Sequence, residues 1–189
     1  MPSAKVVDFA RMVRARSHEN AGALRATSSR QLHGVTIGIL RQELDSMVRV
    51  IYLLSLAPNL RTTLVEASLA GEPWKIPTPS GKLKKVTDRD MVDHAATLHG
   101  WAESVYRFGC AFIHLSQFHD YATRDPVAAL TPGERAAMLR HLRGYHGGPA
   151  RDDFTLVDVV PVLPPVFEKI RSNLDCYLRQ LESGEKLDP

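Results

Sequence analysis

The sequence predicts an all-α protein, an up-down bundle of five to seven helices interrupted by one loop rich in proline and glycine. Apolar residues recur three and four positions apart through most of the chain, which is the spacing of one buried helix face. No segment alternates apolar and polar residues with the period of two that is typical of a half-buried strand. The connections between the periodic segments are short apart from that loop, which favours a bundle of neighbouring helices.

Composition favours one domain in a reducing compartment. The 189 residues are 44% hydrophobic, which is enough for one core and gives no argument for two. Cys110 and Cys176 both lie in predicted helices, so free thiols are expected rather than a disulfide framework. The longest nearly apolar run, residues 50–57, is far shorter than the ~20 residues of a membrane-spanning helix, and no secretory signal is visible. We expect a cytoplasmic protein without contact to a membrane.

The chain is expected to have three parts. Residues 1–29 should form an N-terminal helix, over residues 4–16, and a polar connector that contains glycine. Residues 30–182 should form the helical bundle, because the apolar periodicity and the helix end signals continue through this range. Residues 183–189 should be a disordered tail.

Helix end signals define the elements of the bundle in order. Residues 30–57 keep helical phase for about seven turns and stop before Pro58, because proline disfavours helix at the preceding residue. A shorter helix should follow from residue 60 to about residue 70. The central helix should open at Thr87, which forms a capping box with Asp90, and should continue to about Tyr121.

Two more helices follow the central one. Thr131 and Glu134 form a second capping box, with proline at the first helical position, and a helix through about residue 145 is expected. Pro164 and Pro165 then begin the last helix, whose apolar stripe is as regular as that of the central helix.

The loop at residues 71–86 holds three prolines and two glycines, too many for a long regular element, although a short hairpin fits. It also concentrates positive charge around Trp74. One interpretation is a basic, stacking-capable arm that binds RNA through Lys82, Lys84, Lys85 and Trp74. The other is a solvated loop whose tryptophan packs into the protein body.

Arg107 and His114 are the strongest candidates for chemistry. On a straight helix seven residues leave them about 20° apart around the axis, so they would share one face. Arginine binds phosphate and histidine transfers protons near neutral pH, which together suffice for metal-free RNA cleavage if two copies face each other. In the alternative interpretation Arg107 pairs with Glu103 one turn earlier and His114 is a hydrogen-bonded core histidine.

The segment from Arg107 to His114, RFGCAFIH, resembles the Arg-x4-6-His signature of the HEPN superfamily, and the helix at residues 40–54 also looks like part of that superfamily's bundle. The resemblance covers about residues 30–182 and implies a HEPN-like endoribonuclease that acts as a homodimer, without metal or another cofactor. Such proteins often serve as toxins or in phage defence, with an antitoxin or a nucleotidyltransferase as partner. Glu103, His119 and Tyr121 would then support the catalytic pair.

Two alternatives stay open. HEPN-like proteins also include binding or regulatory members without turnover. A different class, the HD-type metal phosphohydrolases, uses a His-Asp pair such as His119 and Asp120 together with an upstream His94 or His99. Histidines five residues apart lie about 140° apart on a helix, so chelation of a metal within one helix is not expected.

Overall fold

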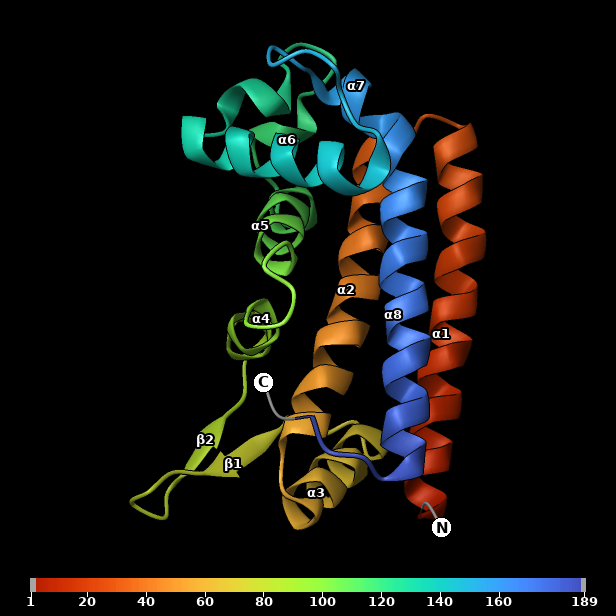
Figure 1. The fold of residues 1–189 in the computed structure, drawn as a ribbon, viewed down its shortest axis with the longest axis vertical. Coiled ribbons are helices and arrows are strands. Elements are labelled where there is room, and N and C mark those ends of the chain that lie inside the picture. Colours follow the sequence, from red (N-terminus) through yellow and green to blue (C-terminus); the bar gives the residue numbers. More distant parts are fainter. Residues whose placement is uncertain (1–2, 188–189) are drawn as a thin grey trace.

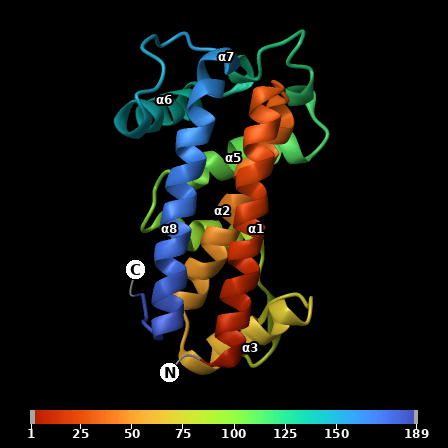
Figure 2. The same ribbon diagram turned by 90° about the vertical axis from the view of Figure 1, so that its right-hand side faces the viewer.

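In a computed structural model, which describes residues 3–187, the fold is built on three long helices. These are α1 (Ala4–Ser29), α2 (His33–Ser55) and α8 (Leu163–Ser183). They lie side by side, with α1 antiparallel to α2 and α8 (Figures 1 and 2). The described residues hold seven helices of nine or more residues, so the all-α prediction is confirmed.

The shorter elements follow between α2 and α8. α4 and α5 cross one side of α2, and α6 lies across the end of the bundle opposite α3 (Figures 1 and 2), so the up-down arrangement is limited to the long helices. The bounds of these elements are α3 (Pro58–Leu69), β1 (Lys75–Pro77), β2 (Leu83–Lys85), α4 (Asp88–Ala96), α5 (Ala102–Ile113), η1 (Gln117–His119), η2 (Pro126–Ala129), α6 (Pro132–His146), α7 (Leu156–Val159) and η3 (Val160–Val162).

Helix α2 lies at the centre of the core. It contacts α1, α8, α4 and α5, and its side chains are therefore buried on most of its circumference. Its fully buried apolar residues include Ile37, Leu44, Met47, Ile51, Leu53 and Leu54. Within residues 3–187 no helix is both long enough and apolar enough to cross a membrane.

The expected connector at residues 17–29 is helical, because α1 continues without interruption to Ser29. Two of its polar residues are buried and serve as hydrogen-bond donors to Glu43 of α2, which has no exposed surface. Ser17 Oγ donates to Glu43 Oε1 at 2.5 Å and Asn20 Nδ2 donates to Oε2 at 2.9 Å. The polarity of this stretch marks a buried contact between α1 and α2, not a solvated connector.

The single central helix predicted from Thr87 to Tyr121 is wrong, because the structure divides it into α4, α5 and η1. Side chains satisfy the carbonyl groups that each break leaves free. Thr97 Oγ1 donates to the His94 carbonyl at 2.7 Å at the end of α4. At the end of α5, Ser116 Oγ donates to the Ala111 carbonyl at 2.7 Å, which turns the chain into η1.

The loop at residues 71–86 and the segment after α8 both form backbone hydrogen bonds. Residues 75–77 and 83–85 pair as an antiparallel hairpin. After α8, Gly184 adopts a left-handed conformation with φ 77°, and the Leu187 N–H donates to the Leu54 carbonyl at 3.0 Å. The disorder predicted for the tail at residues 183–189 stays a prediction, and residues 188–189 lie outside the described residues.

Candidate functional site

Arg107 lies at a cavity between α5 and α6. The cavity has a volume of about 550 Å³, which is in the range of small-molecule sites. Its wall is mainly apolar, and its polar side chains come from three residues of α5 and one residue of α6. Its lining includes Glu103, Arg107, Phe108, Phe118, Glu134 and Met138.

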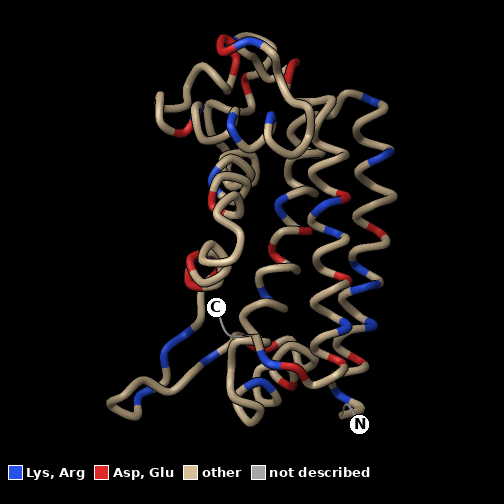
Figure 3. The backbone as a smooth tube through the Cα atoms, viewed as in Figure 1, with Lys and Arg blue, Asp and Glu red and all other residues tan. Residues whose placement is uncertain are grey.

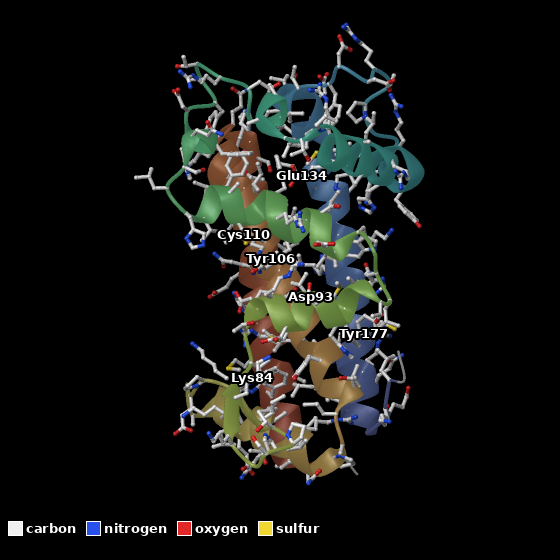
Figure 4. All side chains as sticks on the ribbon, turned by 90° about the vertical axis from the view of Figure 1, so that its left-hand side faces the viewer. Lys84, Asp93, Tyr106, Cys110, Glu134 and Tyr177 are labelled. Carbon is white, nitrogen blue, oxygen red and sulfur yellow. The ribbon has the colours of Figure 1, made fainter. Side chains whose placement is uncertain are left out.

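Two carboxylates hold the Arg107 side chain, which is 52% exposed. Its Nη2 atom is 2.8 Å from Glu103 Oε1, one turn earlier in α5, and its Nη1 atom is 3.7 Å from Glu134 Oε1 of α6. Glu134 also closes the predicted capping box with Thr131, and Figure 4 shows it on α6 next to α5. Hydrogen bonds from Thr131, followed by the charge of Arg107, lower the pKa of Glu134.

His114 is the first residue after α5, and its backbone is extended, with φ −92° and ψ 139°. Its side chain is exposed, and within residues 3–187 it has no hydrogen-bond, ion-pair or ring partner. The neighbouring Ile113 and Leu115 are 50% and 95% exposed. Because the helix ends at Ile113, Arg107 and His114 do not form one continuous helical ridge, and His114 does not line the cavity.

The residues expected to support the pair have different roles. Glu103 contacts Arg107, as the alternative interpretation of the sequence had it. The His119 ring lies 3.1 Å, measured from Nε2, from the Phe112 carbonyl and so closes the end of α5. The Tyr121 ring packs against His33 of α2, with 5.8 Å between the centroids. His119 and Tyr121 therefore shape the segment after α5 and do not contact Arg107.

The basic loop separates into an exposed hairpin and a buried tryptophan. Trp74 is only 3% exposed, its Nε1 donates to Ser68 Oγ at 2.7 Å, and its ring stacks on Tyr52. The structure therefore agrees with the interpretation in which the tryptophan packs into the protein body. Lys82, Lys84 and Lys85 are exposed on the hairpin, where Figure 3 shows positive charge, and Lys84 pairs with Asp90 at 2.8 Å.

A buried arginine beside α5, Arg41, was not identified from the sequence. Arg41 is 4% exposed, its guanidinium lies 4.3 Å from the centre of the Tyr106 ring, and its Nη2 is 3.2 Å from Asp88. Burial lowers the pKa of Arg41, but the neighbouring Cys110 and the carboxylates outweigh this effect and raise it. Figure 4 shows Tyr106 and Cys110 on adjacent turns of α5.

In the sequence, Gly109 is the residue that could have indicated the close contact between α5 and Arg41 of α2. It interrupts an otherwise bulky helix, and a Cβ atom built there would lie 2.7 Å from Arg41 Cβ. A glycine inside a helical pattern indicates that another element approaches closely. Here α2 and α5 approach so closely that the Arg41 stem occupies the space of a side chain.

The remaining histidines do not form a metal site. Within residues 3–187 no three His, Cys, Asp or Glu residues lie close enough together to hold a metal ion. His94 packs its ring against Tyr52 at 5.7 Å, and His99 Nε2 shares a hydrogen bond of 2.7 Å with Tyr177. Neither His94 nor His99 forms a cluster of possible metal ligands with His119 and Asp120. The structure therefore does not bring together the metal ligands that the HD-type alternative requires.

Comparisons of the chain with protein-family models, curated proteins and solved structures found no match. The site combines a half-exposed arginine at a cavity with an exposed histidine at the end of the same helix, and this histidine has no partner within the described residues.

Proposed function

We propose that the protein is a HEPN-like, metal-independent endoribonuclease that acts as a homodimer, as the sequence resemblance implies. The observation that carries the proposal is that the His114 side chain is exposed and has no partner within residues 3–187. The alternative of a hydrogen-bonded core histidine does not hold, since the ring is exposed and has no partner within the described residues. An accessible imidazole ring can take a proton from a substrate and can give one to a leaving group.

In this proposal Arg107 binds the scissile phosphate and His114 removes the proton from the ribose 2′-hydroxyl. The 2′-oxygen attacks phosphorus, the bond to the 5′-oxygen breaks, and the leaving oxygen takes a proton from the His114 of the second copy. The products are a 2′,3′-cyclic phosphate and a 5′-hydroxyl. Arg107 offsets the negative charge that develops on the phosphate in the transition state.

Two surfaces fit such a dimer on RNA. The exposed apolar side chains of Ile113 and Leu115 flank His114, and a second copy that covers them would bring the two histidines together. The hairpin residues Lys82 and Lys85 have no ion-pair partner within residues 3–187 and are available to RNA phosphates.

A second candidate is a HEPN-like RNA-binding protein without turnover. Arg107 already lies between Glu103 and Glu134, at 2.8 Å and 3.7 Å, and both carboxylates compete with a phosphate for the guanidinium. An arginine held in this way contributes less to a developing phosphate charge, which favours binding over cleavage.

The test is the integrity of RNA incubated with purified protein and EDTA, with dimerisation followed by light scattering. Wild type should cleave, and His114→Ala and Arg107→Ala should each lose at least about a hundredfold in rate. His18→Ala removes an exposed histidine of α1, and Arg179→Ala removes an arginine with the same i, i+4 pairing, so both should cleave normally. Cleavage that survives His114→Ala, or an inactive folded dimer, would overturn the nuclease, and RNA binding by that dimer would support the second candidate.

A further inference from the structure

Aromatic and flexible apolar side chains line part of the cavity at Arg107. On one side Phe108 and Phe118 stand at an angle of 80° with 6.4 Å between ring centroids. The α6 side is formed by small and flexible residues, among them Ala137 and Met138. Aromatic rings and methionine are the usual contacts of an inserted nucleobase or another planar ring.

The carboxylates of Glu103 and Glu134, which line this cavity, can accept further hydrogen bonds. The ion-pair distances of Glu103 to Arg89 and to Arg107 are both measured to its Oε1 atom, and Glu103 Oε2 accepts no hydrogen bond within the described residues. The hydrogen bonds from Thr131 use Oε2 of Glu134, whereas Oε1 lies 3.7 Å from Arg107 Nη1 and accepts no hydrogen bond within residues 3–187. Each carboxylate thus keeps one oxygen whose lone pairs can accept a hydrogen bond from a ligand.

We propose that this cavity binds one unpaired RNA base, and that the base is guanine. The inference rests on the proposed function and adds the base at which the protein acts. The Watson–Crick edge of guanine carries two adjacent donor groups, N1–H and the N2 amino group, and two carboxylate oxygens accept from both. Arg107 lines the same cavity with a side chain that is 52% exposed, and it would contact the phosphate of the same nucleotide.

The other three bases fit this pair of carboxylates less well. Adenine and cytosine each present one amino group beside a ring nitrogen that only accepts, and uracil presents one N–H between two carbonyl groups. A carboxylate opposite an acceptor is repelled and loses its hydration without a new hydrogen bond. The discrimination therefore comes from unfavourable contacts to the wrong bases as well as from favourable contacts to guanine.

The experiment is calorimetric titration of the His114→Ala dimer with GMP, IMP, AMP, CMP and UMP in EDTA. This variant leaves the cavity intact and separates binding from cleavage. GMP should bind at least about tenfold more tightly than AMP, CMP or UMP. IMP, which lacks the N2 amino group, should fall between GMP and the others.

Glu134→Gln and Glu103→Gln, each made in the same background, should lower the preference for GMP about fivefold or more, because an amide replaces one acceptor oxygen by a donor. Glu134→Gln retains the helix cap, since glutamine also serves in a capping box. Glu168→Gln on α8 is the matched control and should not change binding, because within residues 3–187 this carboxylate forms an ion pair only with Arg171.

The outcomes separate the two proposals. Equal binding of all nucleotides, no binding, or a preference for GMP that survives both Gln variants would overturn the guanine site, whether or not RNA is cleaved. Selective GMP binding by a protein that leaves RNA intact would keep the guanine site and overturn the nuclease. If both hold, mapped cleavage sites should lie next to guanosine.

Discussion

Glu43 shows how much a single residue of this protein depends on its surroundings. Its carboxylate lies in the middle of α2 with no exposed surface, and its oxygens accept hydrogen bonds from Ser17 and Asn20 of α1. The residues two positions away, Arg41 and Asp45, are charged as well, so the sequence pattern does not mark Glu43 as buried. Spacing alone does not reveal that α1 covers this side of α2, since the covering helix carries polar residues there.

Replacement of Glu43 by alanine should lower the free energy of unfolding by about 2 to 4 kcal/mol. The buried hydroxyl of Ser17 and the amide of Asn20 would lose their acceptor and stay desolvated. Urea unfolding followed by circular dichroism measures the change, with Glu168→Ala on the exposed face of α8 as control. A loss no larger than that of the control would show that the hydrogen bonds to α1 contribute little.

At the scale of elements, the short-range signals in the sequence located helix starts well and helix ends less well. The capping boxes at Thr87 and Thr131 are both present as predicted. The breaks after Ala96 and Ile113 were missed, because the apolar spacing continues through them into residues that pack on the same core. Helix ends of this kind are fixed by tertiary contacts, such as that of His119 with the Phe112 carbonyl.

The close contact between α2 and α5 at Gly109 can be tested by the stability of two alanine variants. Gly109→Ala should destabilise the fold by about 1 to 3 kcal/mol, because the new Cβ would lie 2.7 Å from Arg41 Cβ and force the helices apart. Gly38→Ala in α2 is the matched control, since nothing lies within 4 Å of its Cβ position. The control should be stabilised by up to about 1 kcal/mol, as alanine favours helix.

Thermal unfolding of the two alanine variants distinguishes the causes. Opposite shifts of the melting temperature would confirm that α2 and α5 are in contact at Gly109, because helix propensity alone raises both. A rise for both variants would contradict the close approach of the two helices.

For the whole molecule, histidines couple stability to pH. Burial is the main cause that lowers the pKa of His94, His99, His141 and His146, and for His141 the value falls to about 4. Three of them lie near Lys169, whose charge disfavours their protonation further. The sequence shows eight histidines but not their burial, which depends on tertiary contacts such as those of His94 with Tyr52 and of His99 with Tyr177.

Acidification should therefore weaken the fold before the carboxylates titrate. A histidine whose pKa is lowered in the folded state contributes its full stability above its unfolded pKa of 6.5, and this contribution is lost as the pH falls toward about 4. His141 alone accounts for on the order of 2 kcal/mol. Melting temperatures measured between pH 7.5 and pH 4 should fall steadily, and less so in His141→Gln. An unchanged slope in that variant would contradict the assignment to His141.

The fold predicted from sequence and the fold of the structure agree in class, and they differ in how the middle of the chain crosses the bundle. Apolar periodicity identifies which residues are buried, but not the angle at which two helices meet. Arg107 and Glu103 were paired from their spacing alone, whereas Glu134 reaches the same guanidinium only because α6 lies over α5. Local parts of the candidate site were predictable, and the cavity that joins them was not.

The hydrogen bond from Leu187 to Leu54 has a practical consequence. It holds the end of the described chain against the α3 end of the bundle, where α1 also begins, and α6 with the cavity at Arg107 lies at the opposite end (Figure 1). A fluorescent dye on Ser3 or Lys186 would report on the molecule without shielding the cavity. The same placement suits surface immobilisation, because either attachment would leave the α5 and α6 face pointing toward the solution.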